Sequence, residues 1–161
     1  MALADLYAEY QPALLRYLRG RAGDAADDFA SETWISAAQG LNRFAGGSDE
    51  FRAWLFTIAR HRLIDQRRKE KRRPLFSSTD DSTAEIPARD ASPEDVVTAA
   101  AAGDEAARRI ANLLPADQAD VILLRVVGGL SVEEVAGIMG KKPGTVRVLQ
   151  SRGLKRLQKY L

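Results

Sequence analysis

The chain has 161 residues, a net charge of +2, 45% hydrophobic residues and 29% charged residues, which is close to the composition of an average globular protein. It has no cysteine and one histidine, which excludes disulfides, thiolate metal sites and multi-histidine zinc sites. Because no apolar run approaches the ~20 residues that span a bilayer and no signal peptide is evident, we expect a cytoplasmic protein without membrane insertion or cofactors.

The charges are unevenly distributed along the chain. Residues 1–73 carry 13 Lys and Arg against 10 Asp and Glu, residues 74–105 carry 1 against 8, and residues 106–161 carry 10 against 4. Two basic segments on either side of an acidic one indicate two modules that face a polyanion, joined by a solvated linker.

The first basic segment is predicted to form three helices. Apolar residues recur at steps of three and four over residues 3–19, which glycines follow, and over residues 24–39. A glycine-containing loop then leads to a third helix over residues 49–72, and Pro74 ends it. From Arg60 to Arg73 this helix has eight Lys and Arg against two acids, a pattern typical of a surface that contacts phosphates.

The acidic segment predicts a linker followed by more helices. Residues 75–91 are rich in Ser, Thr, Asp and Pro, which favours a flexible segment. Ser92 and Pro93 favour the start of an alanine-rich helix, broken or bent near Gly103, that continues to residue 114. Pro115 opens a further helix to about residue 127. No alternating pattern typical of strands is found, so the expected fold class is all-α.

The last segment has the pattern of a helix-turn-helix. Ser131 and Glu134 match a capping box, and a hydrophobic staple is formed by the apolar residues around them. Gly140 suits a left-handed turn at the end of this helix, and Pro143 suits the first turn of the next one. In a helix-turn-helix the second helix enters the major groove of DNA.

The second of these helices carries the residues expected to contact DNA. Seven Lys and Arg and no acids lie between Lys141 and Lys159. The candidates for contact with bases or phosphates are Lys141, Lys142, Thr145, Arg147, Val148, Ser151, Arg152 and Lys155. The apolar residues Val146, Leu149, Leu154 and Leu157 are expected in the core. The alternative is a helical hairpin with a solvated basic face.

Three stretches of the chain resemble the extracytoplasmic-function sigma factors, a class of small promoter-specificity subunits of bacterial RNA polymerase. Residues 24–34, DAADDFASETW, are similar to the acidic helix start DAEDLVQETF of that family. Residues 51–68, FRAWLFTIARHRLIDQRR, are similar to RAWLxxIARNxxxDxxRR, with His61 in place of the common asparagine. Residues 130–136, with GTVR at 144–147, resemble the C-terminal helix-turn-helix.

The resemblance implies two small helical domains joined by a flexible acidic linker. Residues 1–73 would be region 2, which binds the β′ clamp helices of core RNA polymerase and recognises and melts the promoter −10 element. Residues 74–104 would be the linker, and residues 105–161 would be region 4, which binds the β flap and recognises the −35 element. The resemblance also implies an anti-sigma factor as a partner and no enzymatic activity.

The same resemblance assigns roles to residues of region 2. The expected polymerase-binding residues are Asp28, Ser31, Glu32, Ile35 and Gln39. The expected −10 residues are Asn42, Phe44, Ser48, Phe51, Arg52, Arg60, His61, Arg62, Arg67 and Arg68. Core packing is the alternative for Phe44 and Phe51, and Trp34 fits either the core or the interface.

Two other functions stay open at this point. A stand-alone helix-turn-helix regulator would bind paired half-sites as a dimer, although no dimer face is visible in the sequence. A small nuclease would use Asp27, Asp28 and Glu32 to hold a divalent ion, although no base or nucleophile stands at a matching spacing.

Overall fold

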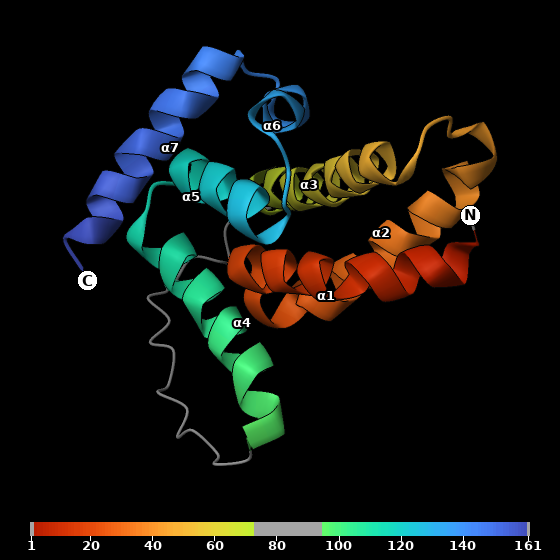
Figure 1. Ribbon diagram of the computed structural model, residues 1–161, viewed down its shortest axis with the longest axis horizontal. Coiled ribbons are helices and arrows are strands. Elements are labelled where there is room, and N and C mark those ends of the chain that lie inside the picture. Colours follow the sequence, from red (N-terminus) through yellow and green to blue (C-terminus); the bar gives the residue numbers. More distant parts are fainter. Residues whose placement is uncertain (1, 73–94, 161) are drawn as a thin grey trace.

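The computed structural model describes residues 2–72 and 95–160, with the backbone alone at residues 95–100. The expected linker over residues 75–91 and the helix start at Ser92 lie outside these residues. The seven α-helices of the described part are α1 Leu3–Ala22, α2 Ala26–Gly40, α3 Ser48–Arg72, α4 Asp95–Leu113, α5 Ala116–Ile122, α6 Val132–Met139 and α7 Pro143–Gln158 (Figure 1). Two 3₁₀ turns, η1 Gly23–Ala25 and η2 Leu41–Arg43, and a π-helical turn, η3 Leu123–Val127, join some of them. The described residues contain no strand, so the all-α prediction is confirmed.

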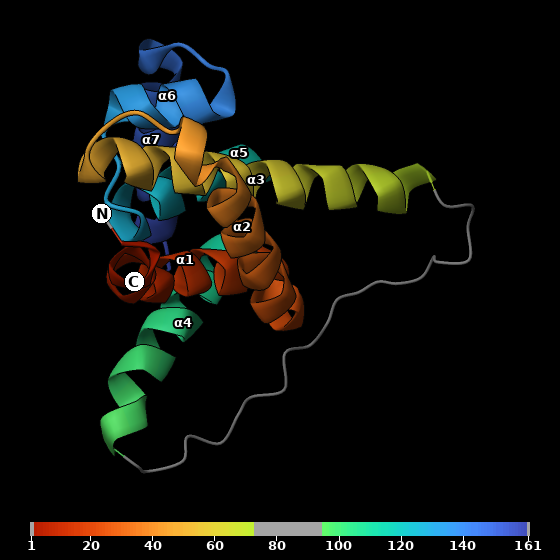
Figure 2. The ribbon, with the colours of Figure 1, turned by 90° about the vertical axis from the view of Figure 1, so that its right-hand side faces the viewer.

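The first three helices bury the apolar faces that the sequence predicts. On α1 the buried residues Leu6, Tyr10, Leu14 and Leu18 recur every four positions, which places them on one side of the helix. The α3 helix contributes its own buried stripe against them, which includes Leu55. Its C-terminal turns extend beyond the other described helices (Figure 2), so the basic end of α3 is exposed.

The helix boundaries differ from the prediction at two glycines. α1 continues through Gly20 to Ala22 because this glycine serves packing: a Cβ atom at Gly20 would lie 3.1–3.2 Å from atoms of Ala107 and Leu123. α4 likewise runs unbroken through Gly103, where α1 lies alongside it. The alanine-rich helix expected up to residue 114 is therefore present, and it includes residues 95–104 of the range assigned to the linker.

The helix predicted to run from Pro115 to residue 127 is also different. Pro115 is its N-cap, the α-helical part ends at Ile122, and the next five residues form η3. In η3 the amide of Gly128 donates to the carbonyl of Leu123, 3.0 Å away. This wider turn is local and leaves no periodicity in the sequence that would reveal it.

The two halves of the chain pack against each other along α1 and α3. α4 and η3 lie against α1, and α6 lies against α3 (Figures 1 and 2). A single apolar cluster runs across this boundary, and it joins Leu14, Tyr17 and Leu55 of the first half to Val121, Leu124 and Leu130 of the second.

No described helix is both long enough and apolar enough to cross a membrane.

Candidate nucleic-acid interface

The helix-turn-helix of α6 and α7 has the local interactions that the sequence predicts. Ser131 Oγ accepts a hydrogen bond from the Glu134 amide at 3.0 Å, and the Ser131 amide donates to Glu134 Oε1 at 2.8 Å. Gly140 has a φ of 66°, which is the left-handed conformation that glycine adopts at little cost. Pro143 lies in the first turn of α7. The predicted helix-turn-helix is therefore confirmed.

α7 is anchored on α5 by one buried face. Val146 and Gly153 are buried, and a Cβ atom at Gly153 would lie 2.5 Å from Ile122 Cδ1. The glycine thus allows the two helices to approach closely. Leu154, one position further round the helix, is 44% exposed; its predicted place in the core is wrong because α5 covers the side of α7 that carries Gly153.

The opposite face of α7 presents the predicted DNA contacts to solvent. The exposed members are Lys142, Thr145, Arg147, Val148, Ser151, Arg152 and Lys155. Lys141 is half-buried, with its Nζ atom 3.3 Å from Asp117 Oδ2. Arg147 lies 3.3 Å from Glu133 Oε1, with both side chains largely exposed. Such a surface pair contributes little, so this arginine is available to a ligand.

The −10 candidates on α3 fall into two groups. His61, Arg62 and Arg68 are exposed, and Arg62 also contacts Ser36 and Glu32 of α2. Three other arginines bond to the rest of the chain. Arg52 donates to the Gly129 carbonyl at 3.3 Å, Arg60 donates to Asp120 at 2.6 Å, and Arg67 donates to the Arg21 carbonyl at 3.3 Å.

The loop before α3 is supported by an aromatic cluster. Phe51 is fully buried and its ring centroid lies 5.6–6.2 Å from those of Tyr10, Phe44, Trp34 and Trp54. In this structure Phe51 therefore fills the core beneath the loop, which is the alternative that the sequence left open for it. Trp34 is also buried, with its indole N–H donating to Gln11 Oε1 at 2.6 Å.

The remaining loop candidates lie nearer the surface. Asn42 is exposed, Phe44 is half-buried, and its ring stacks on Trp54 with centroids 5.0 Å apart. Ser48 is half-buried, and its carbonyl accepts a hydrogen bond from the Tyr10 hydroxyl at 2.9 Å. Asn42 and one edge of the loop thus remain open to a ligand, while Ser48 and Phe44 hold the loop in place.

The predicted polymerase-binding residues share one face of α2. Asp28, Ser31, Glu32, Ile35 and Gln39 are all exposed and follow one another at helical spacing. Ile35 is 57% exposed, so an apolar side chain stands among acidic and polar ones. Within the described residues, Asp27, Asp28 and Glu32 do not converge as the ligands of a metal ion would.

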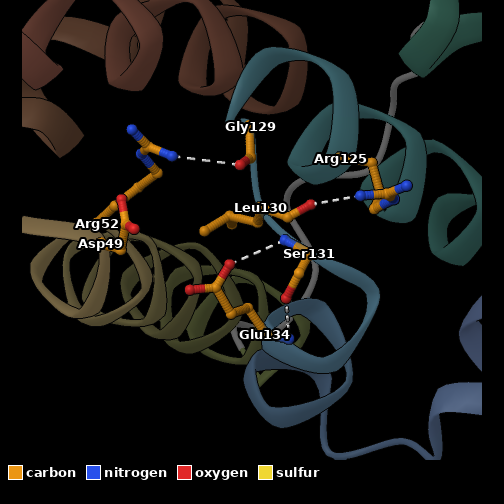
Figure 3. A pocket seen from close by; sticks show the side chains of 7 residues that line it. All are labelled: Asp49, Arg52, Arg125, Gly129, Leu130, Ser131 and Glu134. Atoms are coloured by element: carbon orange, nitrogen blue, oxygen red, sulfur yellow. Dashed lines mark hydrogen bonds between the residues drawn. The ribbon is translucent and has the colours of Figure 1, made fainter.

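Figure 3 shows the pocket where the turn before α6 meets α3. It is lined by Asp49 and Arg52 of α3, by Arg125, and by residues 129–131 with Glu134. The Arg52 guanidinium points at the Gly129 carbonyl, and Arg125 Nη1 donates to the Leu130 carbonyl at 2.8 Å. These two arginines hold the backbone that leads into the helix-turn-helix.

A buried carboxylate between the two halves was not predicted from the sequence. Asp120 of α5 is 3% exposed. Its Oδ1 atom accepts a hydrogen bond from the Tyr17 hydroxyl at 2.6 Å and lies 3.5 Å from Arg21 Nε, and its Oδ2 atom accepts from Arg60 Nε at 2.6 Å. Burial, and then the charge of Asp120, raise the pKa of Tyr17 well above 10.0, so the phenol stays a donor. No local pattern reveals this cluster because its members are far apart in the sequence.

Comparisons with known proteins find a matching family for each half of the chain. Residues 6–73 match the family model described as Sigma-70 region 2, and residues 104–157 match the one described as Sigma-70, region 4. The ECF RNA polymerase sigma factor ShbA of Streptomyces griseus is 34% identical over 165 residues, which cover 98% of this chain and 86% of that protein. The ECF RNA polymerase sigma factor SigD of Mycobacterium tuberculosis is also 34% identical, over 98% of this chain and 76% of that protein.

A solved structure is similar over nearly the same length. It is the sigma factor RpoE in complex with the anti-sigma factor NepR from Bartonella quintana, which is 31% identical to this chain. The TM-score is 0.72, and the match covers 96% of this chain and 95% of that one. The likeness therefore includes both helical halves.

Proposed function

Because this chain belongs to the extracytoplasmic-function sigma factors, we propose that its two halves divide promoter recognition between them. The chain binds RNA polymerase and DNA, directs promoter-specific transcription initiation and is not an enzyme. In the proposed division, residues 1–73 act on the −10 element and residues 105–161 on the −35 element. The observation that carries the proposal is the exposed basic face of α7, the second helix of the helix-turn-helix.

Reading of the −35 element is assigned to the N-terminal half of α7. Thr145, Arg147 and Val148 lie on the exposed turns that a recognition helix inserts into the major groove. Val148 offers an apolar contact to a thymine methyl group, and an arginine can pair with a guanine. The phosphate contacts are assigned to the flanking cations Lys141, Lys142, Arg152 and Lys155, with Ser151 beside them.

Recognition and opening of the −10 element are assigned to the loop before α3 and to the basic face of that helix. Asn42 is exposed at the loop, and Phe44, two residues further on, is half-buried. An unstacked base needs an aromatic face and polar edges to offset its lost stacking. His61, Arg62 and Arg68 are exposed along α3 and would contact phosphates of the same strand.

Binding of core polymerase is assigned to the exposed face of α2. Acidic Asp28 and Glu32 and apolar Ile35 suit a basic partner with an apolar patch, as expected for the β′ clamp helices. Ser31 and Gln39 extend the same face. The β flap is the proposed partner of the C-terminal half.

An anti-sigma factor is the proposed regulator of this chain. The similar sigma factor from Bartonella quintana was solved in complex with an anti-sigma factor. This chain has no cysteine, so a response to oxidants would have to be built into that partner.

The test is transcription by core polymerase reconstituted with this chain on fragmented genomic DNA. We expect start sites that share two upstream elements. Arg147→Ala is expected to reduce initiation by about tenfold, since one base contact is worth ~1–3 kcal/mol, without changing polymerase binding. Glu32→Lys is expected to weaken polymerase binding instead. Arg109→Ala, an exposed arginine on α4, is the control. If Arg147→Ala weakened only polymerase binding, the assignment of α7 would be wrong.

A further inference from the structure

The cluster around Asp120 joins the two halves of the chain through an anion on one side and its donors on the other. The carboxylate comes from α5, in the half proposed as region 4. The three groups that face it come from α1 and α3, in the half proposed as region 2: the Tyr17 hydroxyl at 2.6 Å, Arg60 Nε at 2.6 Å and Arg21 Nε at 3.5 Å. Region 2 therefore has a preformed set of donors around one anion.

The carboxylate does not satisfy all of these donors. The Arg21 side chain is only 8% exposed, and its buried Nε atom has no hydrogen-bond partner. The two oxygens of Asp120 accept hydrogen bonds from Tyr17 and Arg60, and Oδ1 lies 3.5 Å from Arg21 Nε without forming a hydrogen bond to it. A backbone phosphate also carries one negative charge and accepts charge-assisted hydrogen bonds from arginine. Because it is not fixed on α5 as Asp120 is, it can take a position that also reaches Arg21 Nε.

The cations around the cluster outnumber its single anion, so the cluster carries a surplus of positive charge. Arg21, Arg60 and Arg67 face a single Asp120, and Arg67 donates to the Arg21 carbonyl at 3.3 Å. Burial, and then the charge of Arg21, lower the pKa of Arg67, as expected where cations crowd together. Both Arg60 and Arg67 lie on the basic face of α3.

We propose that Tyr17, Arg21 and Arg60 form a phosphate-binding site of region 2, which Asp120 fills while the two halves are packed together and a backbone phosphate of promoter DNA fills when they separate. The inference rests on the proposed function, because it places DNA along α3. It adds a site on α1 that sequence analysis did not assign, and it makes Asp120 a competitor of DNA. Free chain would then bind DNA less tightly than chain whose halves have separated.

The first test measures binding of a labelled single-stranded oligonucleotide to full-length chain. Asp120→Asn removes the competing charge, and Glu105→Gln, at an exposed position on α4, is the control with the same change in net charge. We expect Asp120→Asn to raise the affinity for the oligonucleotide at least about threefold more than Glu105→Gln does. The substitution weakens the closed form, in which Asp120 competes with DNA for the same donors. Equal effects of the two variants would overturn the proposal.

A double-mutant cycle with Arg60→Gln locates the phosphate. In the parent chain Arg60 supports both the closed form and the DNA-bound form, so its loss changes affinity little. In the Asp120→Asn background its loss removes only the DNA contact, and the gain in affinity disappears. Arg62→Gln is the control, since Arg62 contacts Glu32 and Ser36 rather than Asp120; it is expected to cost the same in both backgrounds. A gain that survives Arg60→Gln would contradict the site.

A second variant opens the chain and leaves Tyr17, Arg21, Arg60 and Asp120 unchanged. Gly20→Leu places a side chain against Ala107 and Leu123, where even an added Cβ atom would lie 3.1–3.2 Å from atoms of both. The chain has no cysteine, so Glu9→Cys and Gln158→Cys give two unique label positions for energy transfer. We expect lower transfer and tighter oligonucleotide binding for Gly20→Leu, with circular dichroism showing retained helix. Lower transfer without tighter binding would overturn the proposal.

Co-elution of the same variants with core polymerase separates the two conclusions. A chain that binds polymerase but shows no difference between Asp120→Asn and Glu105→Gln keeps its proposed function and loses the phosphate site. A chain that does not bind polymerase loses the proposed function.

Discussion

At the scale of single residues, the cost of burying a charge explains the environment of Asp120. A carboxylate that is 3% exposed is tolerated only when it is paired and hydrogen-bonded. Tyr17 and Arg60 supply two short hydrogen bonds from the other half of the chain. The same buried contact therefore stabilises the packed arrangement of the two halves and withdraws Arg60 from the surface.

The Tyr17→Phe variant tests this contact. It removes one hydrogen bond to a buried charge, so we expect the free energy of unfolding at pH 7 to fall by ~1.5–3 kcal/mol. The pKa of Tyr17 is raised in the folded chain, so its contribution is fully present below pH ~10 and is lost as pH rises above that value, where the unfolded chain releases the proton first. Urea unfolding is measured at pH 7 and above pH ~10. The difference in unfolding free energy between the parent chain and the variant should be smaller at the higher pH. An equal difference at both would contradict this role.

Phe51 shows where reasoning from residue type stops. An aromatic residue beside a glycine-containing loop fits base capture and core packing equally well, and only the burial of its ring distinguishes them. The capping box at Ser131 is different, because the side-chain and backbone groups that form it lie within four residues. Local interactions of this kind could be predicted, and contacts between distant segments could not.

At the scale of elements, the position of α7 depends on one glycine. Gly153 lies against Ile122 of α5 with no room for a larger side chain, so the glycine fixes how closely the recognition helix approaches its support. The periodicity of the sequence indicated an apolar inner face for this helix but could not show which of its leucines α5 leaves uncovered. That is why Leu154 was misassigned.

Gly153→Leu is expected to push α7 away from α5. Overpacking of this kind typically costs ~1–3 kcal/mol, and the displaced recognition helix should bind −35 DNA less tightly. Gly137→Ala is the control, since Gly137 is exposed on α6 with nothing within 4 Å of an added Cβ atom; it is expected to stabilise the chain by ~0.5–1 kcal/mol. Thermal unfolding and duplex binding measure both. If Gly153→Leu were as stable as the parent, the close contact with α5 would be refuted.

At the scale of the whole molecule, the two halves share one apolar core. The helix types, their order and the helix-turn-helix were predictable because periodicity and capping are encoded locally. The packing of α4 on α1 was not, because it depends on the small residues Gly20 and Ala107 meeting across a long sequence separation. The result is a closed arrangement in which part of the basic face of α3 is covered.

A shared core predicts cooperative unfolding. Because the apolar cluster joins both halves, we expect the free chain to unfold in one calorimetric transition, with equal calorimetric and van't Hoff enthalpies. Asp120→Asn should broaden or split this transition by weakening the contact between the halves. Two well-separated transitions in the parent chain would show that the halves are independent.

The most direct test of the central conclusion is co-elution of the purified chain with bacterial core RNA polymerase on a sizing column. We predict a stoichiometric complex, which Glu32→Lys weakens and Arg147→Ala leaves intact, because the first residue lies on the exposed face of α2 and the second on α7. Folded chain that elutes apart from the polymerase, with no inhibitor bound, would contradict its role as a sigma factor.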